Sequence, residues 1–329
     1  MTPIVVIGTS SGGVEALRSL VSAIPANFGA PICVVLHRPA HSVSLIAGIL
    51  ERAGRLPAQD ALGGERLEPG RIYVAPADQH LLIEPGHVRL SRGPRENLSR
   101  PAIDPLFRSA AQVYGPAAIG VVLTGDLDDG AAGLDTIRRL GGVTIVQDPE
   151  DAQAPSMPAH ALSHGPVDHC LALQDIPGVL VDEVARYVAP AAERAPVPGD
   201  VEVEVKIAAE AKGMDTGLGL IAEPSVFACP ECHGVLLRLK QAHPARFRCH
   251  TGHAYSSVSL AAAFETHVED ALWGAVRALE EASMLLREMA RAERSVDPPD
   301  AMRAQAARND ADGAVLRGLL GERASRAAG

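Results

Sequence analysis

Several features that would assign a class of protein are scarce or missing in this chain of 329 residues. Aromatic residues make up only 3% of it, so we expect helices that pack closely through small side chains. No apolar run approaches the length of a membrane span, and no charged segment followed by an apolar core opens the chain. A formal net charge of −10 argues against nucleic acid or anionic lipid as a partner. We therefore expect a cytoplasmic protein with no membrane span.

Cysteine is also scarce, at five residues, and its distribution is uneven. Cys33 and Cys170 stand alone, whereas Cys229, Cys232 and Cys249 lie close together late in the chain. Such a cluster suits metal binding in a reducing compartment better than a disulfide framework.

The first 188 residues alternate short apolar runs with helical patterns. Strands are expected at 4–8, 31–36, 119–123 and 143–147, and helices at 13–24, 43–53, 104–114, 130–140, 158–163 and 180–188. This alternation predicts an α/β fold with a doubly wound, mostly parallel, Rossmann-like sheet. The short runs at 71–75, 80–84 and 87–90, separated by Pro and Gly turns, predict an inserted antiparallel meander or hairpin.

The rest of the chain divides by composition. Residues 1–188 would form the α/β domain, and the Pro-, Ala- and Glu-rich stretch 189–225 a linker that includes an extended segment. Residues 226–256 carry the cysteine cluster, and 257–329 form a helical segment. In this last part apolar residues recur every three or four positions, which predicts a long amphipathic helix followed by a second helix after Pro298 and Pro299.

Three residues with complementary chemistry follow strands of the predicted sheet: Ser10, His37 and Asp129. Because the carboxyl ends of parallel strands meet at one edge, we expect these side chains to act together. His37 would take a proton from the Ser10 hydroxyl as it attacks an ester carbonyl, and Asp129 would orient the imidazole. Each residue also has a simpler interpretation, because serine and aspartate often cap helices and histidine is common in loops.

Backbone N–H groups beside Ser10 complete this hypothesis. Those of Ser11, Gly12 or Gly13 could bind the oxyanion that develops. A nucleotide phosphate is the alternative occupant of such a turn, but the spacing excludes it. The segment from Gly8 to Gly13 is not G-x-G-x-x-G and lacks the Gly-Lys-Ser/Thr end of a P-loop.

The cysteine cluster has the spacing C-x2-C-x16-C-x3-H. It indicates a zinc ribbon with Cys229, Cys232 and Cys249 as ligands. His253 is the expected fourth ligand, with the neighbouring His250 as the alternative. Four protein ligands close the coordination sphere, so the zinc would be structural and catalysis would need no cofactor. We accordingly expect loss of the metal to spare hydrolysis of a small ester.

Six ordered segments, from IGTSSGGVEAL and VVLHRPAH through RPAIDPLFRSAA and GVVLTGDLDDGAAGL to VQDPEDAQAPSMPAHAL, resemble the catalytic domain of chemotaxis protein-glutamate methylesterases of the CheB type. The resemblance covers roughly residues 3–188 and implies that Ser10, His37 and Asp129 form a triad. It also implies hydrolysis of glutamyl methyl esters on methyl-accepting chemoreceptors, with deamidation of glutamine in related members. Arg100 and Ser11 are candidates for lining the cleft; alternatively they are an ion-pair partner and a helix cap.

The chain departs from the family pattern in two places. Esterase motifs begin at residue 3, so we expect no phosphoacceptor receiver domain in cis, and Asp126 stands where methionine is common. The Cys/His cassette and the following helix resemble the C-terminal extension of receiver-less members. A zinc ribbon and an amphipathic helix pair suit docking to a helical partner or to another copy of the chain; alternatively, they pack on the esterase part within the chain. A receptor methyltransferase or a separate response regulator are further expected partners. Two other functions stay open: a zinc-stabilised adaptor that binds methylated helices without turnover, and an esterase for another methylated protein.

Overall fold

The computed structural model describes residues 2–42, 44–188, 196–210, 216–242, 244–291 and 298–327. It divides into two compact units, Met1–Leu260 and Ala261–Gly329, which are treated separately below. Within the described ranges, no helix is both long and apolar enough to cross a membrane.

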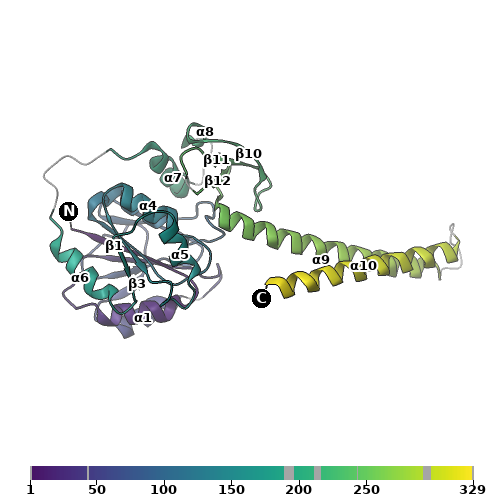
Figure 1. Cartoon of the computed structure of the whole chain (residues 1–329), viewed down its shortest axis with the longest axis horizontal. Coiled ribbons are helices and arrows are strands. Elements are labelled where there is room, and N and C mark those ends of the chain that lie inside the picture. Colours follow the sequence, from purple (N-terminus) through teal and green to yellow (C-terminus); the bar gives the residue numbers. More distant parts are fainter. Residues whose placement is uncertain are drawn as a thin grey trace. The chain divides into compact units, whose positions relative to one another are not determined.

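A seven-stranded parallel sheet forms the centre of the first unit, in the order β3-β4-β2-β1-β7-β8-β9 (Figure 1). Its strands are β1 (Ile4–Thr9), β2 (Ile32–Leu36), β3 (Ala58–Asp60), β4 (Ile72–Val74), β7 (Ala118–Val122), β8 (Val143–Gln147) and β9 (His169–Leu171). The chain builds β2, β3 and β4 on one side of β1 and then returns to place β7 on its other side. This confirms the predicted doubly wound sheet, with its topological switch at β1.

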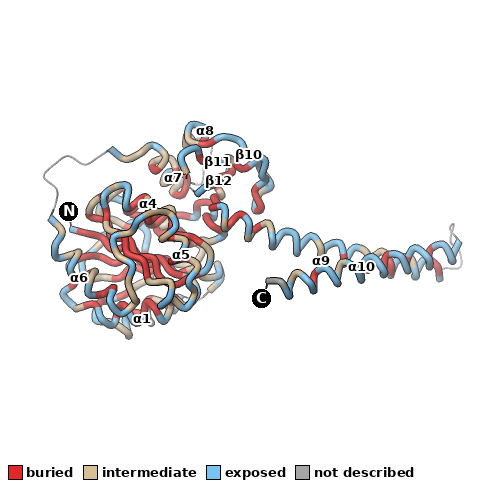
Figure 2. Tube along the Cα trace, viewed as in Figure 1, coloured by how far each residue is buried: buried red, intermediate tan, exposed pale blue. Residues whose placement is uncertain are grey.

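Helices cover both faces of this sheet because alternate residues of each strand point to opposite faces. On one face, Val5 and Ile7 of β1 pack with α1 (Gly13–Ala23), α2 (Ile46–Ala53) and α6 (Ile176–Arg186). On the other, Ile4 and Val6 pack with α3 (Ile103–Tyr114), α4 (Ala131–Arg139) and α5 (Ser156–Ser163). The strands are accordingly the most continuously buried part of the unit (Figure 2).

The predicted meander is only partly correct. Strands β5 (His80–Glu84) and β6 (His87–Ser91) form the expected antiparallel hairpin. The run at 71–75 instead contains β4, which pairs in parallel with β2 and β3 in the central sheet. A short apolar run looks the same in a parallel central strand and in an antiparallel hairpin strand, so the sequence does not distinguish the two kinds of strand.

The described part of the predicted linker 189–225 contains regular structure, which corrects the prediction there; residues 189–195 and 211–215 lie outside the described residues. Helix α7 (Gly199–Glu210) buries Val201, Ile207 and Ala208 and packs on α3. Helix α8 (Leu218–Ile221) follows it. In residues 201–207, apolar side chains alternate with Glu and Lys, a pattern typical of an extended segment. Only the burial of one face of α7 in the folded unit shows that this segment is a helix.

A four-stranded antiparallel sheet follows, which we name the Cys/His sheet. It consists of β10 (Ala222–Ala228), β11 (Val235–Leu239), β12 (Arg246–Cys249) and β13 (Ala254–Ser256). Ala222 and Leu239 share a small core with Ile207 and Leu218 of α7 and α8. The sheet belongs to the same compact unit as the α/β core, so the boundaries expected at 188 and 225 do not separate two bodies.

Buried charges join the Cys/His sheet to the α/β core. Arg248 of β12 lies 3.0 Å from both Glu96 and Glu204, and all three side chains are at most 3% exposed. Arg108 of α3 also contacts Glu96, and Arg246 of β12 lies 2.7 Å from Glu204. Charges removed from water need such partners, because an unpaired buried charge is strongly destabilising.

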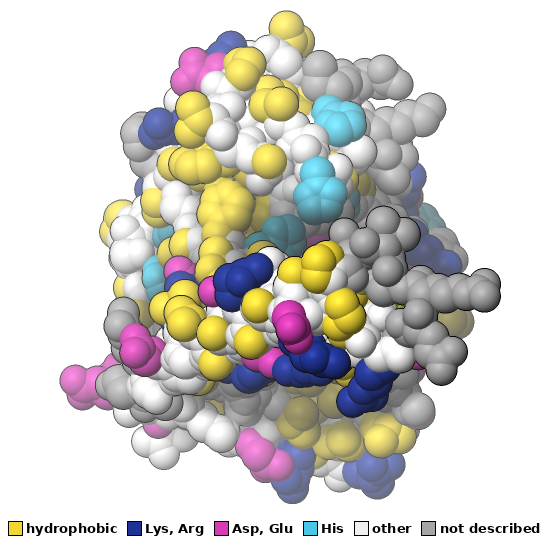
Figure 3. Space-filling view, turned by 90° about the vertical axis from the view of Figure 1, so that its right-hand side faces the viewer, with side chains coloured by type: hydrophobic (Ala, Val, Ile, Leu, Met, Phe, Trp, Pro, Cys, Tyr) yellow, Lys and Arg dark blue, Asp and Glu magenta, His cyan; other side chains and the backbone are white. Residues whose placement is uncertain are grey.

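The C-terminal helices confirm the predicted helical segment. Helix α9 (Ser257–Met289) continues from the first unit into the second, and α10 (Pro299–Ala327) pairs with it. The Ser283 hydroxyl lies 3.2 Å from the carbonyl of Ala306, and an ion pair joins Arg317 to Glu280. Trp273 of α9 is half exposed. Figure 3 shows a face of the molecule on which apolar side chains lie among charged side chains of both signs.

Candidate active site and metal cluster

The pairing of two strands places Ser10 beside His37. Thr9 and Leu36 are paired in the parallel ladder of β1 and β2, and Ser10 and His37 are the residues that follow them. Neighbouring strands lie about 4.8 Å apart, so both side chains leave the same edge of the sheet close together. The N–H of His37 donates to the carbonyl of Thr9 (3.1 Å) and fixes this exit.

Asp129 reaches the same edge from the loop after β7. Its Oδ2 lies 2.8 Å from Nε2 of His37, and its side chain is only 2% exposed. The loop is held to the Ser10 turn, because the N–H of Ser10 donates to the carbonyl of Thr124 (3.0 Å). This contact uses Nε2, one of the two ring nitrogens of His37.

The Asp129 carboxylate is surrounded by donors. It accepts hydrogen bonds from the N–H of Ile103 (2.6 Å), the N–H of Gly130 (3.0 Å) and the side-chain amide of Asn97 (2.9 Å). Burial alone would raise the pKa of Asp129. The hydrogen bond to His37, followed by those from Ile103 and Asn97, holds this pKa below its ordinary value. Asp129 is therefore held in its charged form where it contacts the imidazole of His37.

Asp104 is a second buried carboxyl beside Asp129. Its Oδ1 accepts a hydrogen bond from the N–H of Gly133 (2.7 Å), and its Oδ2 lies 3.2 Å from the amide of Asn97. Burial, with the neighbouring charge of Asp129, raises the pKa of Asp104 to about 7. The two carboxyls thus differ in their tendency to ionise, and the one in contact with His37 is the more acidic.

Two glycines permit the close packing of this edge. A Cβ at Gly125 would lie 2.9 Å from the Cβ of Ser10, so the loop after β7 touches the serine only because residue 125 has no side chain. A Cβ at Gly8 would collide with Ile103, whose N–H bonds Asp129. Glycine is needed at both positions because neighbouring segments approach the backbone closely there, and not because the backbone has an unusual φ angle.

The turn after Ser10 supports part of the predicted oxyanion site. Gly12 has φ +77°, a left-handed conformation that favours glycine. The prediction is corrected at Gly13. Its N–H donates to the carbonyl of Ser10 (2.9 Å) and is therefore not available to an oxyanion. Among the described residues, the N–H groups of Ser11 and Gly12 make no backbone hydrogen bond, so these two remain the candidates.

Side chains near this turn have defined partners. The Ser11 hydroxyl bonds the carboxylate of Asp126, so the residue that departs from the family pattern ties the two loops of the site together. Arg100 lies in an ion pair with Asp78 (2.6 Å) and donates to the carbonyl of Gly93 (2.8 Å). No contact of Arg100 with Ser10, His37 or Asp129 is present in the described part of the chain, and its role in the cleft stays a prediction.

Asn97 is the residue that the sequence reasoning missed. It is 7% exposed, has φ +48°, and contacts both Asp129 and Asp104. It lies in the irregular segment between β6 and α3, where nothing in the spacing marks it. No sequence signal would have identified it.

Three cysteines and one histidine converge in the Cys/His sheet. Their ligand atoms all lie within 4.8 Å of one another; the residues are Cys229, Cys232, Cys249 and His253. Sγ of Cys232 and Sγ of Cys249 are 3.6 Å apart, and Nδ1 of His253 lies 3.5 Å from the latter. Tetrahedral Zn–S bonds of about 2.3 Å would place two sulfurs nearly 3.8 Å apart, so the set could bind such a metal.

The surroundings of the cluster also suit a metal. Nε2 of His253, the ring nitrogen facing away from the cysteines, lies 3.4 Å from the carboxylate of Glu231. A carboxylate on the second nitrogen is the common way to orient a metal-binding histidine. His250 is not part of the group, so the structure favours His253 of the two sequence candidates.

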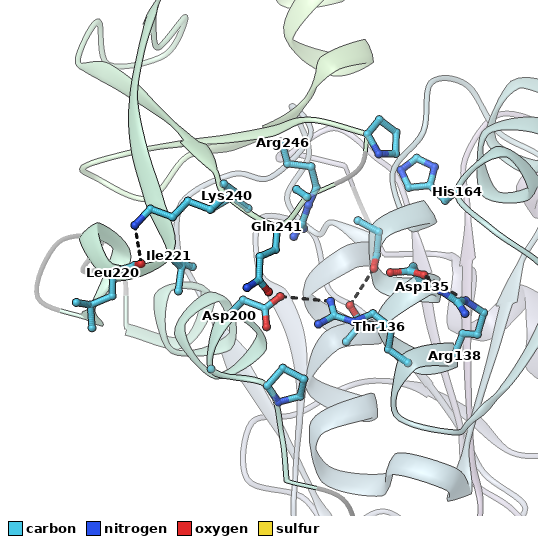
Figure 4. Close-up of a pocket in the computed structure, with 17 residues that line it drawn as sticks. Asp135, Thr136, Arg138, His164, Asp200, Leu220, Ile221, Lys240, Gln241 and Arg246 are labelled. Carbon is cyan, nitrogen blue, oxygen red and sulfur yellow. Dashed lines mark hydrogen bonds and ion pairs between the residues drawn. The ribbon is translucent and has the colours of Figure 1, made fainter.

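A cavity of about 500 Å³ lies elsewhere in this unit, between α4, α7, α8 and the loop after β11 (Figure 4). Its charged residues are mostly paired within the protein: Arg138 with Asp135 (2.5 Å) and Arg139 with Asp200 (3.3 Å). None of Ser10, His37 or Asp129 lines it. The cavity is therefore separate from the candidate active site.

Comparison with known proteins gives a consistent answer. The family model described as CheB methylesterase matches residues 5–180. A Leptospira interrogans protein, provisionally named protein-glutamate methylesterase/protein-glutamine glutaminase, is 42% identical over 173 residues, which are 52% of this chain and 90% of that protein. The Maricaulis maris protein-glutamate methylesterase/protein-glutamine glutaminase is 39% identical over 182 residues, 54% of this chain and 45% of that protein. This chain thus spans less than half of the latter.

The solved structures include one close match to the α/β part. The catalytic domain of the Thermotoga maritima CheB methylesterase superposes with a TM-score of 0.53 at 35% identity, covering 55% of this chain and 98% of that one. The matched region holds the sheet edge that carries Ser10, His37 and Asp129. With its sequence, its parallel sheet and its strand-end residues in agreement, the chain belongs to the CheB methylesterase family.

Proposed function

We propose that this protein is a protein-glutamate methylesterase in which Ser10 is the nucleophile, His37 the general base and Asp129 the orienting carboxylate. The observation that carries the proposal is the 2.8 Å contact between Nε2 of His37 and Oδ2 of Asp129. It lies directly beside the turn that presents Ser10. Under this proposal residues 1–188 perform the catalysis, and 226–256 and 257–329 are a metal-binding and a helical part.

The reaction follows from the positions of these groups. Nδ1 of His37 takes the Ser10 proton while Oγ attacks the ester carbonyl, and the N–H groups of Ser11 and Gly12 bind the oxyanion. The C–O bond to methoxide then breaks, and His37 gives its proton to the leaving methanol. Water activated by His37 cleaves the acyl-serine, so that a glutamate side chain is released and Ser10 regains its proton.

The same groups would deamidate glutamine, with ammonia in place of methanol as the leaving group. The substrates would be helices of methyl-accepting chemoreceptors, since the matched relatives are named for glutamate methyl esters and glutamine. A receptor methyltransferase and a separate response regulator are the further partners that this role suggests. It would place the protein in the cytoplasm, where those helices lie.

The cofactor proposal concerns the Cys/His sheet. We infer that Cys229, Cys232, Cys249 and His253 hold one structural zinc ion, supported by their mutual distances and by Glu231 beside His253. Four protein ligands leave no open position on the metal, so it would supply folding energy and no reaction step.

Methanol release from a methyl-labelled chemoreceptor tests the main proposal. The wild-type protein should release methanol, and Ser10→Ala should reduce the rate to the level of buffer. Ser22→Ala is a matched control, because Ser22 is exposed on α1 and bonds only the carbonyl of Ser19. Turnover of simple esters without receptor turnover would point to another substrate. No turnover of either would favour an adaptor that only binds methylated helices.

A further inference from the structure

The Cys/His sheet is attached to the loop that precedes α3 by backbone hydrogen bonds. The N–H of Asn97 donates to the carbonyl of Ala254 (2.8 Å), and the N–H of Ala254 donates to the carbonyl of Arg95 (3.1 Å). Strand β13 thus forms a short parallel bridge with the segment around Glu96. The two chain segments are 159 positions apart at Asn97 and Ser256, so only the tertiary fold brings them together.

The side chain of Asn97 spans from β13 to the proposed catalytic aspartate. Its Oδ1 accepts hydrogen bonds from the N–H of Ser256 (3.0 Å) and the hydroxyl of Ser259 (3.0 Å). Its amide nitrogen lies 2.9 Å from Oδ1 of Asp129 and 3.2 Å from Oδ2 of Asp104. Two donors on one side and two carboxylates on the other fix the orientation of the amide group.

A second contact runs parallel to the first. The Ser256 hydroxyl donates to Oδ1 of Asp128 (2.7 Å), the residue before Asp129. All of the serines and acids involved are buried. Hydrogen bonds from the end of β13 and the start of α9 therefore reach Asp128 directly and Asp129 through Asn97.

We propose that Asn97, held by Ser256 and Ser259, is a positioning residue for Asp129, so that the Cys/His sheet is a structural part of the active site. The inference rests on the proposed role of Asp129 in ester hydrolysis. Asn97 does not touch the reacting atoms. Its amide supplies a fixed dipole that keeps Asp129 ionised and turned toward His37. A water molecule in the same place would also donate to Asp129, but its orientation would not be fixed.

The charges around this relay determine what removing it should do. Asp129 contacts His37 and Asn97 and interacts with the charges of Asp104, Asp128 and His80, while Arg108 lies 3.6 Å from Asp104. Losing the amide takes a donor from the Asp129 carboxylate and leaves Asp104 as its neighbour. The pKa of Asp129 should then rise, and with it the pH at which the active form of the triad is reached.

The test compares Asn97→Ala and Ser259→Ala with Ser257→Ala in ester hydrolysis. Ser257 is exposed, and among the described residues its hydroxyl bonds only the carbonyl of Ala245, so its substitution controls for loss of a serine at the start of α9. We expect kcat/KM to fall roughly 10- to 100-fold in Asn97→Ala, the scale of a lost charge-assisted hydrogen bond. Ser259→Ala should lose less, about 3- to 10-fold, because the N–H of Ser256 still holds Asn97.

The pH profile separates positioning from general loss of structure. In Asn97→Ala and Ser259→Ala the acid limb of kcat/KM should move to higher pH, and Ser259→Thr, which keeps the hydroxyl, should restore the wild-type profile. An unchanged profile, or the same loss in Ser257→Ala, would overturn the inference. If the wild-type protein hydrolyses no ester, the proposed function fails instead, and the two failures remain distinct.

Discussion

Arg248 and Glu96 form a buried ion pair across 152 positions of sequence, with 3.0 Å between Nη2 and Oε1. Glu96 belongs to the loop before α3, and Arg248 belongs to β12 of the Cys/His sheet. The neighbour of Glu96 is Asn97, which contacts Asp129. The pair therefore joins the Cys/His sheet to the loop that contacts the proposed catalytic aspartate.

Breaking this pair should destabilise the first unit strongly. Arg248→Met leaves Glu96 and Glu204 buried with fewer cationic partners, which we expect to lower the free energy of unfolding by about 3–5 kcal/mol. Arg18→Met provides the control, because Arg18 and Glu15 form an exposed pair whose loss should cost about 0–1 kcal/mol. Denaturant titration of both variants measures the difference, and equal midpoints would contradict a structural role for the buried pair.

Acid should unfold the protein through the same cluster. Burial would raise the pKa of Glu204, but Arg246, Arg108 and Arg248 hold it well below its ordinary value of 4.5. A depressed acidic pKa contributes stability that is present above about pH 4.5 and is lost as the pH falls toward the folded-state value. Thermal melts should show this loss below pH 4.5. In Glu204→Gln the curve should be flatter there and lower at pH 7.

Replacement of the triad carboxylate should leave the fold but not the activity. Asp129→Asn keeps the size of the side chain while removing the charge that stabilises protonated His37, so kcat should fall roughly 10⁴-fold, the scale for losing a triad carboxylate. Stopped or continuous ester assays measure the rate, and a far-ultraviolet spectrum confirms folding. A variant that retains a tenth of the wild-type kcat would remove Asp129 from the mechanism.

Metal removal tests the zinc proposal and its link to catalysis. Elemental analysis should find one zinc ion per chain, lost in Cys249→Ser and kept in Cys170→Ser, whose cysteine is exposed and outside the cluster. The sequence alone predicts that metal loss spares small-ester hydrolysis. The contacts from β13 to Asn97 lead us to expect a lower melting temperature and reduced turnover together. Full activity in metal-free Cys249→Ser would restore the sequence-based expectation.

Local pattern was sufficient for much of the molecule. The strands around 4–8, 31–36, 119–123 and 143–147 were predicted to within a residue or so, because continuous buried β-branched runs have few alternatives. Their parallel arrangement also brought Ser10, His37 and Asp129 to one edge, as expected. The spacing of the three cysteines anticipated a cluster that the fold assembles. The three-residue strand β3 was missed, because so short a run carries no period.

The sequence by itself determined the longer strands and helices of the α/β part and the residue types at the strand ends, since these depend on side chains near in the chain. The tertiary structure alone decided that α7 packs on α3 instead of serving as a linker. It also decided that the N–H of Gly13 donates to the carbonyl of Ser10 and that Asn97 bridges β13 to Asp129. Each of these depends on hydrogen bonds or burial between residues far apart in the chain or within one irregular turn. The periodicity of apolar residues in the sequence does not indicate such contacts, because the two partners meet only when the whole unit is folded.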